Sequence, residues 1–116
     1  MQPRSPGYLE DIRDATAFIL EVTRSKTLED YRDDRILRQA VERNFEIIGE
    51  AVRRLDQHDP HTAARLSDYR RIIAFRNVLI HGYDLVDHAL VWEVITNQAP
   101  ILVSEVEALL HEVPPP

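Results

Sequence analysis

The sequence contains no cysteine, which excludes disulfide bonds, thiolate metal ligands and a cysteine nucleophile together. Glycine is also scarce, with three residues in 116, and this disfavours a turn-rich all-β fold. No apolar run approaches the length of about 18 residues that predicts a membrane span. The first residues lack the basic start and apolar stretch of a signal peptide. We therefore expect a cytoplasmic protein that makes no membrane contact.

Lysine is nearly absent as well, since thirteen of the fourteen basic residues are arginine. The net charge of −6 argues against broad, sequence-independent binding of nucleic acids. The charge is unevenly distributed, however, because residues 53–76 hold six arginines and three aspartates. The planar guanidinium suits bidentate contact with phosphate, although a solvated, salt-bridged helix surface explains such a segment equally well.

A chain of 116 residues has room for one hydrophobic core of ordinary size. We expect a single domain over residues 1–116, with its core at about 8–110 and a flexible proline-rich tail at 111–116. Hydrophobic periodicity predicts helices and no strand. The expected ranges are about 6–23, 36–58, 68–81 and 88–110, with a short helical segment near 62–66. Residues 24–34 are expected to be an acid-rich connector, inside which the helix at 36–58 would begin. This order predicts an all-α, antiparallel up-and-down bundle of four to five helices.

Local signals mark the ends of these helices. N-terminal caps are expected at Ser5, at Thr27 with Asp30 as a capping box, at Ser67 and at Asp87. Gly82 would end the helix at 68–81 as a C′ glycine, and Pro100 would kink or divide the last helix. Gly49 lies inside the most regular helix, where glycine costs about 1 kcal/mol relative to alanine. Close approach of a neighbouring helix at Gly49 would explain its presence.

Most histidines carry no functional signal. We expect His88 and His111 to be exposed helix residues without a role. His58 and His61 flank Pro60 at a spacing that could hold a metal, but no third ligand accompanies them, so no metal site is predicted. Glycine-rich phosphate loops and the G-x-S-x-G motif of serine hydrolases are missing from the sequence.

Residues 76–84 (Arg-Asn-Val-Leu-Ile-His-Gly-Tyr-Asp) place a cation, an amide, an imidazole and a phenol at one helix end. His81 could act as a general acid or base, and Arg76 could hold a phosphate and stabilise its growing charge. In a straight helix Asn77 and His81 share a face, whereas Arg76 and His81 diverge by roughly 140°. A distorted helix end, a swing of the Arg76 side chain or a second copy of the chain would have to bring them together.

The Arg-x4-His spacing is weak by itself, because Arg53 and His58 repeat it at another helix end. A helix that simply ends in His-Gly would also show this spacing. The wider context separates these interpretations.

Taken whole, residues 76–84 resemble the signature of the HepT-like branch of the HEPN superfamily: an arginine, a polar residue, three variable residues, a histidine and then x-Tyr. Residues 42–51, with their Gly-Glu-Ala, are similar to the second helix of that family. Val91-Trp92-Glu93 are similar to its segment after the motif, and the resemblance extends over about residues 8–110. Tyr69 stands where relatives often carry tryptophan, and we expect it to fill the same aromatic packing position.

This resemblance implies a metal-independent endoribonuclease without a cofactor, the toxin of a HEPN/MNT toxin–antitoxin module. Arg76 and His81 would be the catalytic pair and Asn77 their polar support. The 2′-OH of RNA would be the nucleophile. Tyr83 would be adenylylated by an MNT-type nucleotidyltransferase antitoxin, which would silence the toxin.

The resemblance also implies a homodimer with the site near its interface. Such a dimer would bring together two copies of the arginine-rich segment, in which Arg70 and Arg71 are the candidate RNA contacts. One alternative stays open: a non-catalytic HEPN subunit that binds a nucleotide or serves as a scaffold for the nucleotidyltransferase. The intact Arg-polar-x3-His-x-Tyr pattern favours the nuclease, because a scaffold need not keep it.

Overall fold

The computed structural model describes residues 1–114, apart from the side chain of Tyr83, and the regular structure in that range is entirely helical. The elements are α1 (Ser5–Val22), α2 (Leu28–Asp33), α3 (Arg35–His58), α4 (Pro60–Ala63), α5 (Tyr69–His81), the 3₁₀ turn η1 (Tyr83–Leu85), α6 (His88–Glu93), the π-helical η2 (Val94–Gln98) and α7 (Ala99–His111). The predicted all-α class is confirmed. Helix α7 includes the first residue of the expected tail, Pro114 is non-helical, and residues 115–116 lie outside the described range.

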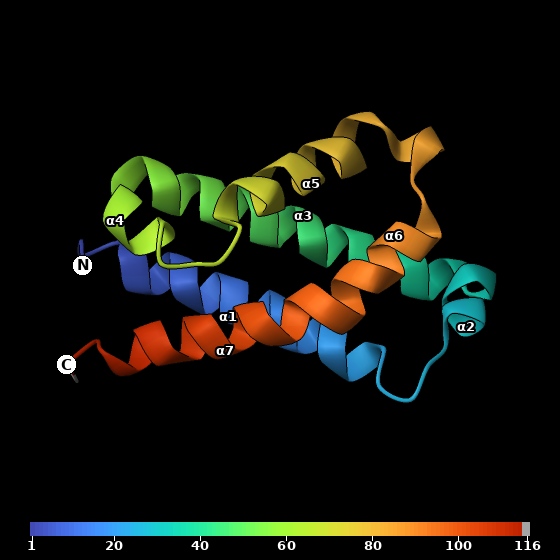
Figure 1. Ribbon diagram of the computed structural model, residues 1–116, viewed down its shortest axis with the longest axis horizontal. Helices are drawn as coiled ribbons and strands as arrows, with labels where there is room; N and C mark the ends of the chain where they lie inside the picture. The colour runs from blue at the N-terminus through green and yellow to red at the C-terminus, as the bar shows by residue number, and fades with distance from the viewer. Residues whose placement is uncertain (115–116) are drawn as a thin grey trace.

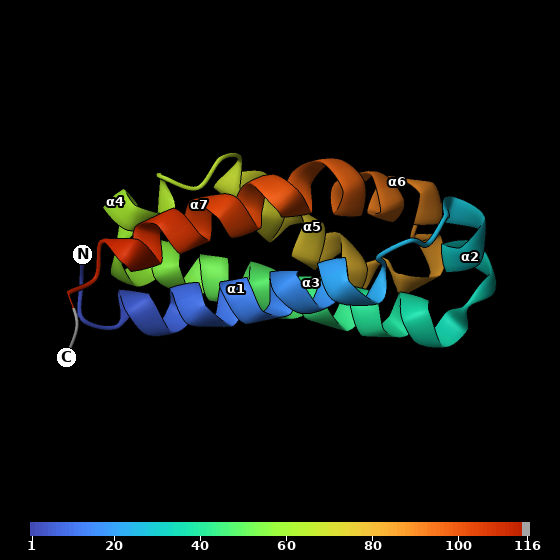
Figure 2. The same cartoon turned by 90° about the horizontal axis from the view of Figure 1, so that it is seen from below.

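The long helices run up and down the molecule. Helix α3 returns antiparallel to α1, α5 runs back along α3, and the continuous α6–η2–α7 rod returns beside α1, so both termini lie at one end (Figure 1). The turned view in Figure 2 shows the same elements stacked in an elongated bundle, whose extents are 44 × 29 × 19 Å. The predicted antiparallel bundle is confirmed. No helix within residues 1–114 is both long enough and apolar enough to cross a bilayer.

The hydrophobic core lies between α1, α3 and α7, and α5 contributes little to it. Leu79 is the buried residue of α5, while Ile72, Ile73 and Phe75 are half-buried against the core. The ring of Phe75 meets that of Phe45 on α3 edge to face, with centroids 5.2 Å apart. Ile80, near the end of this helix, is 36% exposed although it is apolar. Helix α5 therefore packs chiefly on α3, and its other sides stay open.

Several predicted helix ends are confirmed. Thr27 and Asp30 form a reciprocal capping box at the start of α2. The Asp87 carboxylate accepts from the backbone N–H of Ala89 at 2.9 Å and caps α6. Pro100 cannot donate a backbone hydrogen bond, and the hydrogen-bond pattern of the rod changes from α to π in η2, which ends two residues before it. The last helix is thus divided near Pro100, as predicted.

Two predicted caps are wrong, because each side chain binds a carboxylate from elsewhere in the fold. Ser5 is the first residue of α1 rather than its cap, and its hydroxyl donates to Asp59 at 2.7 Å. Ser67 donates its N–H and hydroxyl to Glu105 of α7, and α5 starts after the left-handed residue Asp68 (φ 56°). Gly82 does end α5, but with φ −116° instead of the left-handed conformation of a C′ glycine.

The buried carboxylate of Asp59 ties the N-terminus to the α3–α4 junction. Its oxygens accept from the N–H of Gln2, the hydroxyl of Ser5, and both the N–H and the hydroxyl of Thr62. Burial alone would raise the pKa of Asp59, but the hydrogen bonds from Thr62, Gln2 and Ser5 outweigh it and hold this pKa well below its usual range.

The substitution Asp59→Asn should lower the free energy of unfolding by about 2 kcal/mol at pH 7, because it removes a charged acceptor from four hydrogen bonds. Since the folded-state pKa is depressed, the wild type holds this advantage above the unfolded-state pKa of about 4 and loses it as the pH falls further. Urea denaturation between pH 7 and pH 3 measures the difference. Asp56→Asn, three residues earlier in the last turn of α3 and without a described hydrogen bond, should change little. A deficit of Asp59→Asn that stays constant with pH would contradict this account.

Candidate active site at the end of helix α5

Helix α5 stays α-helical through His81, so its faces are those of a straight helix. Asn77 and His81 lie four residues apart on the outward face, and both are exposed. Arg76 lies on the side that faces α3 and is half-buried. Distortion of the helix end, one of the three ways to bring Arg76 and His81 together, is thus absent.

The guanidinium of Arg76 is held at both of its terminal nitrogens. Its Nη1 donates to the Asn77 Oδ1 at 3.0 Å, and its Nη2 lies 3.3 Å from Oε2 of Glu50 on α3. The Nε atom is buried and has no hydrogen-bond partner among the described residues. The structure therefore brings Arg76 and Asn77 together, whereas no described side chain forms a hydrogen bond or ion pair with His81.

Three arginines from two helices, α3 and α5, contact the carboxylate of Glu50. Arg53 donates to both of its oxygens, at 2.6 and 3.1 Å, and Arg54 donates to Oε1 at 3.0 Å. The hydrogen bonds from Arg53, then those from Arg54, and the charges of Arg53 and Arg76 lower the pKa of Glu50 to about 2. With three guanidiniums around one carboxylate, this group keeps a surplus of positive charge.

Gly49, directly before Glu50, lets α5 approach α3 closely. A Cβ added at Gly49 would lie 2.2 Å from Cβ and 2.7 Å from Cγ of Arg76, and 3.3 Å from the carbonyl oxygen of Ile72. The predicted close approach of a neighbouring helix is confirmed, and the neighbour is the helix that carries the motif. The aliphatic part of Arg76 lies on the glycine, and its charged end reaches Glu50.

The guanidinium forms part of the wall of a surface depression of about 310 Å³ between α1, α3 and α5. Tyr8 of α1, Arg54 of α3 and Ile80 of α5 also line it. His81 does not line it, so within one chain Arg76 and His81 face different surfaces.

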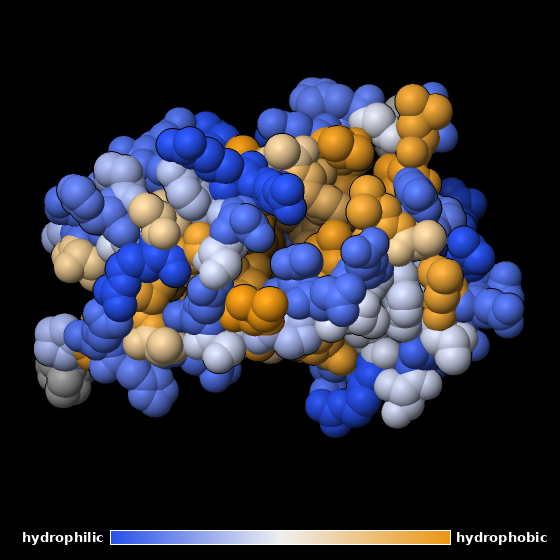
Figure 3. All heavy atoms as spheres, in the orientation of Figure 1, coloured by the Kyte–Doolittle hydropathy of each residue, from blue (hydrophilic) through white to orange (hydrophobic). Residues whose placement is uncertain are grey.

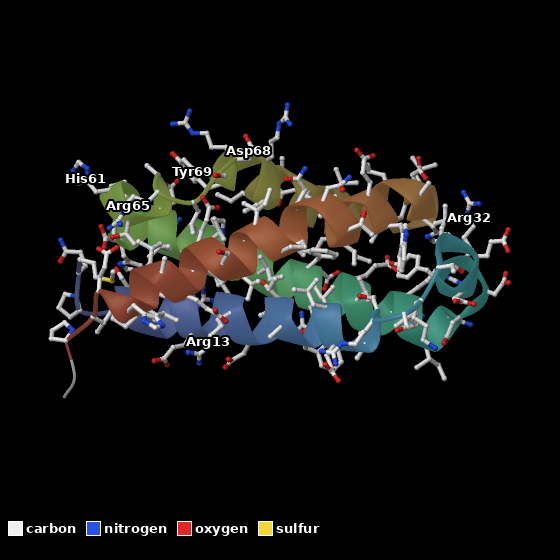
Figure 4. All side chains as sticks on the ribbon, turned by 60° about the horizontal axis from the view of Figure 1, so that its bottom comes forward. Arg13, Arg32, His61, Arg65, Asp68 and Tyr69 are labelled. Atoms are coloured by element: carbon white, nitrogen blue, oxygen red, sulfur yellow. The ribbon has the colours of Figure 1, made fainter. Side chains whose placement is uncertain are left out.

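The candidate RNA contacts Arg70 and Arg71 lie at the other end of α5, on different flanks. The Arg70 guanidinium carbon lies 5.5 Å from the centre of the Tyr69 ring, and its Nε donates to the Tyr69 hydroxyl at 3.2 Å. Figure 4 shows Tyr69 and Asp68 at this start of α5. Tyr69 also packs against the core, which confirms its predicted packing position.

Arg71 lines an apolar groove of about 360 Å³ between α5 and the α6–η2–α7 rod. The hollow between these elements is visible as apolar surface in Figure 3. Phe75 and Ile72 form its α5 side, and Leu90 and Ile101 lie on the rod.

The remaining histidines lie away from this helix end. His58 stacks on Tyr8 with ring centroids 5.8 Å apart, and His61 is exposed near the termini (Figure 4). His111 is exposed as predicted, but His88 is not: it is half-buried, and its ring meets the Tyr31 ring edge to face at 6.1 Å. Nowhere in residues 1–114 do three or more His, Asp or Glu side chains form a group that could hold a metal ion.

Tyr83 begins η1, two residues after His81, and its side chain lies outside the described part of the chain. Glu50, by contrast, is described fully and was not among the predicted site residues. Its arginine partners at i+3 and i+4 could have been found from sequence spacing. Its contact with Arg76 could not, because it joins residues that are 26 positions apart on different helices.

Comparisons with known proteins match nearly the whole chain to one family. The family profile described as "Ribonuclease HepT-like" matches residues 12–109. A "Probable ribonuclease HepT" from Thermococcus cleftensis is 36% identical over 112 residues, which cover 94% of this chain and 98% of the relative. A "Putative RNase" from Caldanaerobacter subterraneus subsp. tengcongensis is 32% identical over 105 residues, covering 90% and 93%. No solved structure shows significant similarity to this chain.

The substitution Gly49→Ala should lower the free energy of unfolding by about 1 to 3 kcal/mol, because the added methyl forces α5 away from α3. Gly7→Ala is a matched control, since an added Cβ there meets nothing within 4 Å. It should be neutral or slightly stabilising, by less than about 1 kcal/mol, through helix propensity. Urea denaturation measures the free energy of unfolding of both variants. Equal stability of Gly49→Ala and Gly7→Ala would show that the packing of α5 on α3 does not require a glycine at position 49.

Proposed function

Because the chain belongs to the HepT-like ribonuclease family, we propose that it is a metal-independent endoribonuclease whose active site is the C-terminal end of α5. The observation that carries the proposal is the intact Arg76-Asn77-x3-His81 pattern at an exposed helix end, with Arg76 held by Asn77 and Glu50. The relatives named as ribonucleases cover nearly the whole chain and support the same activity.

RNA supplies its own nucleophile, because the 2′-OH lies next to the scissile phosphate. Attack of the 2′ oxygen on phosphorus forms the new P–O2′ bond, and the P–O5′ bond breaks. His81 takes the proton of the 2′-OH while water protonates the leaving 5′ oxygen, or His81 donates a proton to that oxygen while water takes the proton of the 2′-OH. Arg76 stabilises the negative charge that grows on the phosphate oxygens, and Asn77 holds Arg76 through the 3.0 Å hydrogen bond.

A second copy of the chain completes this site in the proposal. In a single chain, Arg76 and His81 diverge by roughly 140° around a straight helix. The surface around the motif carries exposed apolar side chains that an interface would cover, namely Val78 (54% exposed) and Leu85 (82%). A symmetric pairing of α5 ends would place the imidazole of one copy near the guanidinium of the other.

The proposed partner is an MNT-type nucleotidyltransferase that acts as the antitoxin and adenylylates Tyr83. The modification would add a bulky group and a negative phosphate two residues from His81. That charge would repel the RNA backbone and occlude the site, by the same electrostatics as a phosphorylation switch. The nuclease would then be the toxin of a toxin–antitoxin pair.

The substitution His81→Ala should lower kcat/KM for a mixed RNA substrate by about a hundredfold or more, because it removes the general acid or base. The assay contains EDTA, and wild-type cleavage should depend on pH near neutrality. His111→Ala, an exposed histidine on α7, is the control and should cleave like the wild type. Equal, negligible cleavage by wild type and His81→Ala would leave only the non-catalytic scaffold.

Binding of RNA to an acidic protein should depend on the arginines of α5. For a 2′-O-methyl RNA oligonucleotide, which the 2′-OH mechanism cannot cleave, affinity should fall as salt rises. Replacing Arg70 and Arg71 by glutamine should reduce the slope of log affinity against log salt by about 0.7 for each phosphate that the protein no longer neutralises. Arg32→Gln, on α2 and well separated from Tyr69 at the start of α5 (Figure 4), should leave the slope unchanged. A wild-type affinity that is independent of salt would contradict this.

A further inference from the structure

Among the described carboxylates, Glu50 is the one that forms an ion pair with the proposed catalytic arginine. Two neighbouring residues of α3 share the contact with Arg76. The backbone of Gly49 leaves room for its Cβ and Cγ, and the Glu50 carboxylate reaches its Nη2 at 3.3 Å. Contacts with α3 therefore position the Arg76 side chain both near its Cα and at its guanidinium.

Glu50 is itself fixed in place by its own helix. Arg53 spans both carboxylate oxygens and Arg54 binds Oε1, so Oε2 is turned toward Arg76. The low pKa of about 2 keeps Glu50 ionised near neutral pH. The guanidinium thus meets a rigid negative charge rather than a mobile one.

A guanidinium carries five N–H donors in one plane. The Asn77 Oδ1 accepts one from Nη1, and the Glu50 carboxylate forms an ion pair with Nη2 at 3.3 Å, so both terminal nitrogens are engaged and N–H donors remain for a phosphate. The Nε–H is buried and unpaired in the described structure. Since three arginines surround one carboxylate, the pairing with Glu50 does not cancel the positive charge that a phosphate would meet.

We propose that Glu50 is a positioning residue for Arg76: it holds the guanidinium in the orientation that stabilises the charge of the transition state, without touching RNA itself. The inference rests on the proposed ribonuclease function. It assigns the Glu50–Arg53–Arg54 group a role in catalysis through Arg76, in addition to any role in the stability of α3.

The test compares Glu50→Gln, which keeps the length and removes the charge, with Glu46→Gln. Glu46 lies one turn earlier on α3, is equally exposed (25% against 26%) and pairs with Arg43 rather than Arg76. We expect Glu50→Gln to lower kcat about tenfold to a hundredfold, as for a misplaced catalytic group, with KM unchanged or lower because two arginines are released. Glu46→Gln should keep the wild-type kcat, and Glu50→Asp should recover part of the loss.

The double variant distinguishes positioning from a general structural effect. In the Arg76→Ala background, Glu50→Gln should cause no further loss of kcat, because there is no guanidinium left to position. Losses that multiply, a change confined to KM, or equal losses in Glu46→Gln would overturn the proposal. Circular dichroism and thermal unfolding of each variant show that the bundle is retained.

A second readout is independent of cleavage. The ¹⁵N NMR signals of the Arg76 guanidinium, identified by their disappearance in Arg76→Lys, should show faster rotation about the Nε–Cζ bond and faster Nε–H exchange in Glu50→Gln but not in Glu46→Gln. Unchanged signals in Glu50→Gln would overturn the positioning role whatever the activity. A wild type that holds Arg76 in this way but cleaves no RNA would instead overturn the proposed function.

Discussion

The contact between Gly49 and Arg76 is the constraint on which the arrangement of this site depends. With any side chain at Gly49, the Cβ would overlap the Arg76 stem, which the structure places 2.2 Å from that position. The glycine costs the helix about 1 kcal/mol in propensity, and in return the motif-bearing helix lies directly on α3. Because of this approach, a carboxylate of α3 reaches the guanidinium of Arg76.

The position of α5 explains how the candidate site segment can be both ordered and accessible. One side of the helix is attached to α3, through Leu79, the half-buried Phe75 and the Gly49 contact. The other sides border a depression toward α1 and an apolar groove toward the α6–η2–α7 rod. Asn77 and His81 therefore remain on the surface, where a substrate or a second copy of the chain can reach them. Their five-residue spacing on a straight helix leaves Arg76 and His81 on different faces of one chain.

The local charge near Arg76 differs in sign from the net charge of the chain. The chain is acidic overall, yet two acidic groups that flank α5 are engaged: Glu50 contacts three arginines, and Glu105 accepts from Ser67 near the start of α5. Local positive charge thus persists at Arg76 in a protein of net charge −6. Long-range attraction of a polyanion by the whole protein is weak under these conditions, so an RNA-binding surface would act at short range.

The sequence by itself determined the helical class, the order of the helices and the local signals at their ends, because periodicity and capping act over three or four residues. Thr27 with Asp30 and Asp87 behaved as such local rules predict, and the motif around His81 was visible for the same reason. Only the tertiary structure decided where Ser5 and Ser67 donate and which residue pairs with Arg76, because the partners come from distant parts of the chain. Helix packing brings a carboxylate close to each serine hydroxyl, and the hydroxyl then binds this carboxylate instead of capping its own helix. The spacing of residues along the chain does not predict such a contact.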